Sequence, residues 1–164
     1  MSLTGTTAFV GLGANLGDRA ATLERALDEM AALPGTSLRA RSAFYETAPV
    51  DAGGGDYLNA VACLRTTLAP VALLRALQAI EAAHGRLRPH ASAPRSLDLD
   101  LLLHGETTLT TAELVLPHPR LHLRAFVLMP LAEIAAGLHV PGRGSVETLL
   151  EPLGSQRVVR WAQP

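Results

Sequence analysis

The chain has 164 residues, 48% apolar and 18% charged, which indicates a globular protein with enough length for one domain and its core. Its net charge of −1 excludes the broad positive field typical of nucleic-acid-binding and membrane-surface proteins, so any anion site must be local. One cysteine, Cys63, excludes an intramolecular disulfide, and no apolar run has transmembrane length. Without a signal-peptide pattern at the start, we expect a single cytoplasmic domain, 1–164, that is a monomer with no membrane or nucleic-acid partner.

Hydrophobic spacing predicts six elements before residue 105. In chain order they are a strand at 7–12, a helix at 17–32, strands at 37–46 and 57–66, a helix from Pro70 to about Gly85, and a strand within 93–105. This order predicts an α+β fold, the ferredoxin-like βαββαβ plan, with an antiparallel sheet covered by helices on one face. Residues 126–136 and the segment SVETLLEPL indicate extra C-terminal helical elements.

The last of these strands, in APRSLDLDLLLHG, carries two carboxylates in an otherwise apolar run. Because strand side chains alternate, Leu97, Leu99 and Leu101 should enter the core while Asp98 and Asp100 lie on the other face, about 7 Å apart along the strand. Two carboxylates on the face that the helices leave uncovered suit Mg²⁺, which binds one or two carboxylates together with phosphate oxygens. The alternative is a pair of solvated aspartates on an open sheet face.

Three arginines, Arg86, Arg88 and Arg95, precede the two aspartates in GRLRPHASAPR. Guanidinium groups match the geometry of phosphate oxygens. Arginines for phosphates and carboxylates for a metal ion together predict a metal–nucleotide site. The alternative is that these arginines pair with the aspartates or with solvent.

The Gly-rich turn in AFVGLGANLGDR is a loose match to the dinucleotide-binding fingerprint, since its spacing is G-x-G-x-x-x-G. No second parallel strand ending in an acidic residue is indicated about 20 positions later. We therefore favour a tight strand-to-helix turn with Asn15 or Asp18 near the helix start.

Two further segments carry candidate binding residues. In DYLNAVACL, Tyr57 and Asn59 share a strand face and could stack on and hydrogen-bond a flat heterocycle, although ordinary strand packing is the alternative. In LPHPRLHLRAF, Pro119 argues against a helical His118–His122 metal pair. We interpret His118 and Arg124 as phosphate or base contacts, with surface polar residues as the alternative.

The segments FVGLGANLGDR, FYETAPV, DYLNAV, IEAAHGRLR, PRSLDLDLLLHG and LPHPRLHLRAFVLMPL together resemble the 6-hydroxymethyl-7,8-dihydropterin pyrophosphokinase family over residues 7–136. The resemblance implies transfer of pyrophosphate from ATP to the pterin hydroxymethyl group in folate biosynthesis, with AMP as the other product. The most specific segments are PRSLDLDLLLHG and DYLNAV.

The resemblance also implies a role for individual residues. Asp98 and Asp100 would hold two Mg²⁺ ions, and Arg86 and Arg95 would act on the phosphates from a closing loop. The implied pterin-binding residues are Gly13, Thr47, Ala48, Val50, Tyr57, Asn59 and Phe126. The implied ATP-binding residues are Gln78, Glu81, Arg88, Leu101, His118 and Arg124.

The chain departs from the family pattern at three places. Ser92-Ala93 stand where many members carry Trp-Gly, Pro119 follows His118 where an aromatic residue is common, and Ala14 replaces a common serine. The rival hypotheses are a non-catalytic nucleotide- or partner-binding module, an RNA-binding domain and a nicotinamide-binding enzyme. Neutral charge and only six Phe, Tyr and Trp residues disfavour the RNA-binding domain.

Overall fold

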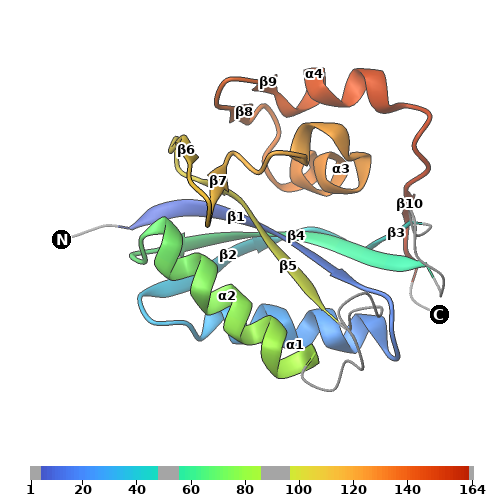
Figure 1. Cartoon of the computed structure of the whole chain (residues 1–164). Helices are drawn as coiled ribbons and strands as arrows, with labels where there is room; N and C mark the ends of the chain where they lie inside the picture. Colours follow the sequence, from blue (N-terminus) through green and yellow to red (C-terminus); the bar gives the residue numbers. More distant parts are fainter. Residues whose placement is uncertain (1–4, 48–55, 86–96, 163–164) are drawn as a thin grey trace.

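A computed structural model describes residues 5–47, 56–85 and 97–162 and shows a mixed α and β architecture around an antiparallel sheet (Figure 1). The strands of the main sheet are β1 (Thr6–Ala14), β2 (Thr36–Arg41), β3 (Tyr45–Thr47), β4 (Tyr57–Thr66), β5 (Asp98–His104) and β10 (Val159–Arg160). Two short hairpins are formed by β6 (Leu109–Thr110) with β7 (Val115–Leu116) and by β8 (His139–Val140) with β9 (Gly144–Ser145). The helices are α1 (Arg19–Ala31), α2 (Pro70–Gly85), η1 (Leu121–Leu123), α3 (Ala125–Ile134), α4 (Val146–Leu150) and η2 (Glu151–Leu153).

Strand β1 lies inside the sheet and pairs antiparallel with β4 on one side and β5 on the other. The far edge of β4 pairs with both β2 and β3, so the predicted strand 37–46 is two strands. The interruption lies at Ser42, whose backbone N–H donates to the Val61 carbonyl while its hydroxyl oxygen accepts from the Val61 N–H. These two bonds replace regular strand pairing and bend the chain there.

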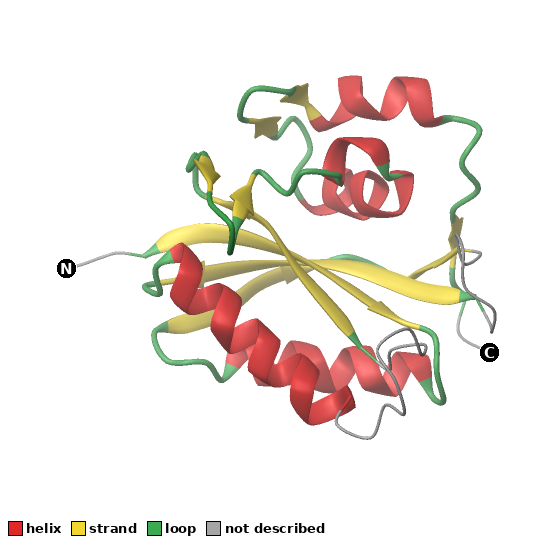
Figure 2. Cartoon of the chain, viewed as in Figure 1, coloured by secondary structure: helices red, strands yellow, loops and turns green. Residues whose placement is uncertain are grey.

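Helices α1 and α2 cover one face of the sheet, as the apolar spacing predicts (Figure 2). Leu23, Leu27, Leu73 and Leu77 are fully or almost fully buried against the sheet residues of this core. The N-terminus of α1 is capped by Asp18, whose carboxylate accepts from the Ala21 N–H at 3.1 Å. The tight-turn interpretation of the Gly-rich segment is thereby confirmed.

The other face of the sheet is also partly covered, so the prediction that helices occupy one face alone is wrong. Helices α3 and α4 lie on it and bury a second core against Phe9, Val61 and Leu102 (Figure 1). These three side chains reach the second face by ordinary strand alternation, since Phe9 follows the phase of Gly11, Val61 that of Asn59 and Leu102 that of Asp100. A register shift between β1 and β5, where Val10 pairs with Leu101 and Phe9 with Leu103, turns Leu103 to the second core as well, while Leu101 stays in the first.

The C-terminal residues return to the sheet and close its edge. Strand β10 pairs with β3, and the Trp161 N–H donates to the Phe44 carbonyl at 2.8 Å. The Trp161 and Phe44 rings lie 6.1 Å apart, between centroids. Within the three described ranges, no helix has the length and apolar character needed to span a bilayer.

Glu133 of α3 joins the second layer to the sheet edge. Its carboxylate accepts from the Ala43 N–H at 3.0 and 3.1 Å and from the Tyr45 hydroxyl at 2.7 Å. Burial, together with the hydrogen bond to Glu133, raises the pKa of Tyr45 to about 12. Because burial is the largest cause of the raised pKa, the buried neutral hydroxyl contributes its full stability below about pH 10, and this contribution is lost as pH rises toward 12.

We predict that Glu133→Leu lowers the free energy of unfolding by about 1–3 kcal/mol, since the Ala43 N–H and the Tyr45 hydroxyl both lose their acceptor. Urea unfolding followed by circular dichroism measures the change. The control is Glu106→Leu in the exposed turn after β5. An equal effect of the two substitutions would contradict the assigned link.

Candidate active site

The two aspartates of β5 lie on the sheet face opposite the leucines, as predicted. Leu97, Leu99 and Leu101 are buried in the core under α1 and α2, whereas Asp98 and Asp100 are partly exposed. The Asp100 side chain keeps 45% of its surface accessible, so its carboxylate can be reached from solvent.

On this face the strand next to β5 places a glycine beside each of the two aspartates. Asp98 pairs with Gly13 of β1, Gly13 with Asn59 of β4, and Asn59 with Tyr45 of β3. Directly paired residues project to the same face, so Asp98 and Asn59 are separated by one glycine. Asp100 likewise pairs with Gly11.

A side chain at Gly13 would crowd its neighbours. A Cβ atom at Gly13 would lie 3.1 Å from the Asn59 side-chain oxygen and 3.7 Å from the Tyr57 ring. The Asn59 amide is buried, and its nitrogen donates to the Thr47 hydroxyl at 2.8 Å. Four predicted pterin-binding residues, Gly13, Thr47, Tyr57 and Asn59, are therefore brought together on three adjacent strands.

Arg124 approaches the aspartates from the second layer. Its guanidinium group lies 3.9 Å from the Asp100 carboxylate, and its Cζ atom lies 5.5 Å from the centre of the Phe126 ring. At these distances Arg124 contacts Asp100 loosely and stacks on Phe126. One side chain thus joins a predicted metal ligand to a predicted pterin-binding residue.

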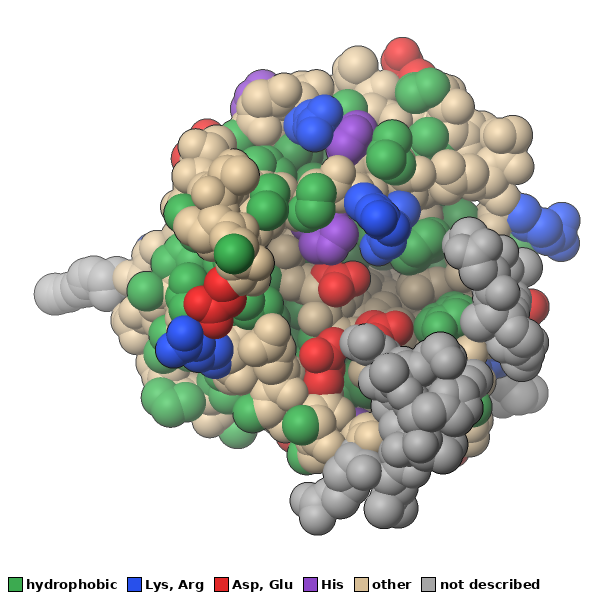
Figure 3. Space-filling model, in the orientation of Figure 1, with side chains coloured by type: hydrophobic (Ala, Val, Ile, Leu, Met, Phe, Trp, Pro, Cys, Tyr) green, Lys and Arg blue, Asp and Glu red, His purple; other side chains and the backbone are tan. Residues whose placement is uncertain are grey.

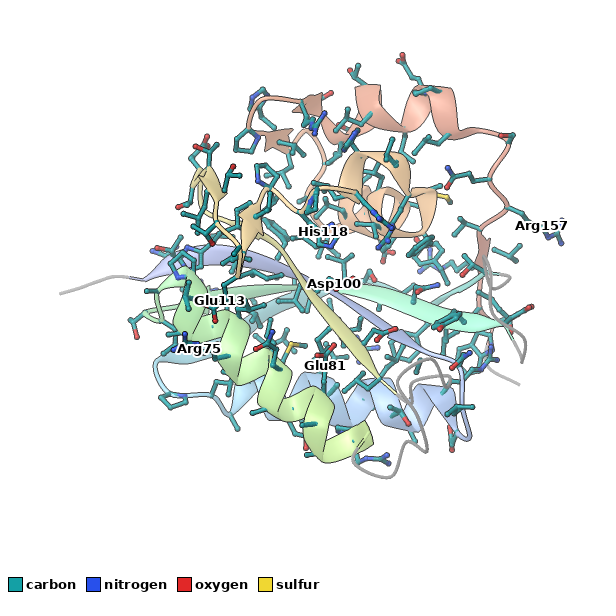
Figure 4. All side chains as sticks on the ribbon, viewed as in Figure 1. Arg75, Glu81, Asp100, Glu113, His118 and Arg157 are labelled. Carbon is teal, nitrogen blue, oxygen red and sulfur yellow. The ribbon has the colours of Figure 1, made fainter. Side chains whose placement is uncertain are left out.

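His118 lies beside Asp100 (Figure 4). Burial lowers the pKa of His118, although the Asp100 carboxylate acts in the opposite direction, so the imidazole is neutral at pH 7. Its Nδ1 accepts from the Arg120 N–H at 3.1 Å, which places the imidazole proton on Nε2. The backbone is fixed by a 2.9 Å bond from the His118 N–H to the Leu102 carbonyl. His118 is therefore a fixed, neutral hydrogen-bond donor.

The space-filling view shows acidic side chains gathered beside a histidine and an arginine above β5 (Figure 3). Across the described residues, no group of three or more His, Cys, Asp or Glu side chains is arranged to enclose a metal ion. A pair of carboxylates suits a hard divalent cation that keeps ligands from water and phosphate. The residues present are thus suited to Mg²⁺ bound with a phosphorylated substrate rather than to a metal site formed by protein alone.

Three predicted ATP-binding residues lie away from this face. Gln78 is exposed on α2, and Glu81 of α2 accepts from the Leu99 N–H at 2.7 Å. The Leu101 side chain is 2% exposed and faces α1 and α2. Their contacts with ATP stay predictions. The predicted Ala48, Val50, Arg86, Arg88 and Arg95 lie outside the described residues.

Sequence patterns missed two side chains that support the site. Arg19 donates to the Asp56 carbonyl and contacts the Glu46 carboxylate, both at 2.9 Å, and so joins α1 to the strands that carry Thr47 and Tyr57. Gln156 hydrogen-bonds the backbone on both sides of Arg124. These contacts join residues far apart in the chain, and no local pattern signals them.

Comparison with known proteins shows the family to which the chain belongs. Residues 9–136 match the model of the 7,8-dihydro-6-hydroxymethylpterin-pyrophosphokinase (HPPK) family. The chain belongs to the HPPK family. A 2-amino-4-hydroxy-6-hydroxymethyldihydropteridine pyrophosphokinase of Methylorubrum extorquens is 44% identical over 93% of this chain and 99% of its own length. One of Pseudomonas aeruginosa is 44% identical over 87% of this chain and 88% of its own.

Solved HPPK structures share the fold of this chain. A Plasmodium falciparum HPPK-DHPS triple mutant with SDX-DHP aligns with a TM-score of 0.75 at 15% identity, over 92% of this chain and 44% of that one. An HPPK-DHPS in complex with substrates aligns with a TM-score of 0.72 at 12% identity, over 92% and 44%. The chain thus spans less than half the length of these two-part proteins. The family resemblance seen in the sequence is confirmed.

We predict that Gly13→Ala and Gly11→Ala differ, although both glycines lie on the same strand face. At Gly11 the nearest atoms to a Cβ are Leu102 side-chain carbons at 3.6 Å, an ordinary contact, whereas at Gly13 the Asn59 amide must move. We expect Gly13→Ala to cost about 1–3 kcal/mol of unfolding free energy and to shift the Asn59 side-chain amide signals in NMR. Gly11→Ala should leave both nearly unchanged, and equal effects would contradict the crowding argument.

Proposed function

We propose that this chain is a Mg²⁺-dependent pyrophosphokinase that transfers the pyrophosphoryl group of ATP to the hydroxymethyl group of 6-hydroxymethyl-7,8-dihydropterin in folate biosynthesis, releasing AMP. The observation that carries the proposal is the row Asp98–Gly13–Asn59 across β5, β1 and β4. It sets a carboxylate for phosphate-bound metal and an amide suited to a flat heterocycle on the same face, with one strand between them. The family membership agrees with both halves of this row.

The pterin would lie beside Gly13 and next to Asn59. The Asn59 side-chain amide has a fixed orientation, because its nitrogen donates to Thr47 and its oxygen faces Gly13. It can therefore pair with the donor and acceptor groups of a heterocycle in one orientation alone. Tyr57 and Phe126 would stack on the two faces of the ring. Ala48 and Val50 would complete this subsite through their backbone.

Asp98 and Asp100 would hold two Mg²⁺ ions. When bound, these ions neutralise phosphate charge and bring the phosphates close to the substrate hydroxyl. Asp100 has its nearest described cation, Arg124, at 3.9 Å, which is too far to replace a metal ion in neutralising the carboxylate fully.

ATP would cross the open edge of β5. Leu99 directs its N–H outward to Glu81, and strand alternation directs the backbone of Leu101 to the same edge. The Leu101 side chain is in the core, so its contact with ATP would come from the backbone. His118 Nε2 and Arg124 would donate to ATP oxygens or nitrogens, with Gln78, Glu81 and Arg88 as further contacts.

In the reaction, the pterin hydroxymethyl oxygen forms a bond to the β-phosphorus of ATP as the bond from that phosphorus to the oxygen bridging to the α-phosphorus breaks. AMP leaves with the bridging oxygen, and the hydroxyl proton passes to solvent. Arg86 and Arg95 would neutralise the charge that moves between the phosphates. Catalysis would come from orientation and electrostatic stabilisation rather than from a strong base.

We also propose that the antiparallel sheet with α1 and α2 is the ferredoxin-like βαββαβ plan and that the protein is a cytoplasmic monomer. The strand order β3–β4–β1–β5 supports the first of these statements. The single cysteine, which excludes an intramolecular disulfide, fits a reducing compartment such as the cytoplasm.

The nucleotide products test the proposed reaction. With ATP, Mg²⁺ and 6-hydroxymethyl-7,8-dihydropterin, we expect pterin-dependent AMP together with pyrophosphorylated pterin, separated by ion-exchange chromatography. EDTA should abolish AMP formation, and excess Mg²⁺ should restore it. ADP as the product would indicate a different phosphotransferase, whereas Mg²⁺-dependent ATP binding without turnover would indicate a binding module.

We predict that Asp98→Ala and Asp100→Ala each lower kcat by at least about a hundredfold, since a lost metal ligand removes charge stabilisation in the transition state. Both side chains lie off the core, so circular dichroism should show wild-type folding. Asp28→Ala on an exposed position of α1 is the control and should keep full activity. Wild-type turnover in either β5 variant would refute the metal role.

A further inference from the structure

Gln156 lies in the tail that follows η2, and its amide group holds the junction between η1 and α3. The side-chain oxygen accepts from the Ala125 N–H at 2.8 Å, and the side-chain nitrogen donates to the Leu123 carbonyl at 2.9 Å. The residue between these two contacts is Arg124. Both peptide groups that flank Arg124 are therefore fixed by one side chain from more than 30 positions away.

The junction has ordinary helix bonds at Arg124, whose N–H donates to the Leu121 carbonyl at 3.4 Å and whose carbonyl accepts from the Leu128 N–H at 3.0 Å, but its two flanking peptide groups are held from outside. Arg124 has extended backbone angles, φ −124° and ψ 108°, between two helical segments, and its side chain does not cap α3. The first N–H groups of a helix have no acceptor within the helix. For Ala125 this acceptor is the Gln156 oxygen. Without Gln156, the Ala125 N–H and the Leu123 carbonyl on either side of Arg124 lose the hydrogen bonds that fix the orientation of their peptide groups.

The tail that carries Gln156 is anchored on both sides. Before it, Val146 of α4 is fully buried in the second core that α3 shares. After it, β10 pairs with β3, and the Trp161 N–H donates to the Phe44 carbonyl. The Gln156 backbone N–H itself donates to Leu153 at 3.0 Å. An anchored residue can fix the position of Arg124, whereas a residue on a loose end cannot.

The position of Arg124 matters because its side chain contacts both Asp100 and Phe126. A displacement of the junction would change the distance from the guanidinium group to the β5 carboxylates. It would also move Phe126, which lies one residue beyond Ala125. In a site that acts by orientation, a displacement of about 1 Å costs up to about a hundredfold in rate.

We propose that Gln156 is a positioning residue of the pyrophosphokinase reaction and acts through Arg124. This inference rests on the proposed function of Arg124 in ATP binding. It assigns a part in the reaction to the tail, which lies beyond residues 9–136 that match the family. Gln156 is exposed, so its effect on turnover should exceed its effect on stability.

The test compares Gln156→Met with Glu147→Met in the full chain. Methionine keeps the length of glutamine but makes neither hydrogen bond. Glu147 is the matched control, because its carboxylate accepts from the Gly137 N–H at 2.9 Å in the same C-terminal region, away from Arg124. We expect Gln156→Met to lower kcat/KM for ATP about tenfold. Glu147→Met should keep wild-type turnover. The two variants should unfold at the same thermal midpoint.

Two further variants separate positioning from general loosening. Gln156→Glu keeps the acceptor for Ala125 but loses the donor to Leu123, so its kcat/KM should fall between those of the wild type and Gln156→Met. In an Arg124→Ala background, Gln156→Met should lower kcat/KM by less than about twofold, since residues that act as a unit are not additive.

The outcomes distinguish the two proposals. If Arg124→Ala keeps wild-type turnover, the role assigned to Arg124 is wrong and the inference is overturned with it. If Arg124→Ala loses turnover while Gln156→Met behaves like Glu147→Met, the inference alone is overturned. A full tenfold effect of Gln156→Met in the Arg124→Ala background would also overturn it.

Discussion

The alternation of side chains along β5 is the constraint on which the site depends. The strand directs Leu97, Leu99 and Leu101 into a closed core, which fixes its register against β1. A slip of one residue would bury both carboxylates and expose the leucines, at a cost of several kcal/mol. The stability of the core thus guarantees that Asp98 and Asp100 face the same side. Burial of the leucines on one face of β5 therefore positions the aspartates on its other face.

The neighbouring strands use this face in a way that only small residues allow. Gly11 and Gly13 lie opposite the two aspartates and carry no side chain over the sheet. Under the proposed function, the flat pterin would lie beside Gly13, between the β5 carboxylates and Asn59. The second layer supplies the other wall through α3, and Arg124 joins the two walls by contacting Asp100 and Phe126.

The sequence predicted what is periodic or local. Strand β4 has the predicted bounds, the helices α1 and α2 lie where apolar spacing placed them, and the Asp98–Asp100 face is correct. Predictions from the sequence were wrong where a strand departs from regular alternation. Ser42 divides a predicted strand through bonds to Val61, and the register shift in β5 turns Leu103 to the face opposite the one that alternation predicts. The pairing of Gly13 with both Asp98 and Asn59 depends on strand order, which the pattern of one strand does not contain.

The roles of Gln156 and Glu133 were missed because hydrogen bonds between residues far apart in the chain produce no regular residue spacing in the sequence.

The number of divalent ions bound with nucleotide tests the account most directly, because every proposed role depends on the β5 carboxylates holding metal with phosphate. Mn²⁺ can replace Mg²⁺, and electron paramagnetic resonance counts the free ion in the presence of the protein, the pterin and an ATP analogue with a methylene bridge between the α- and β-phosphates. We expect two ions per chain in the wild type, and fewer in Asp98→Asn and Asp100→Asn. The same count in the wild type and both variants would contradict the account.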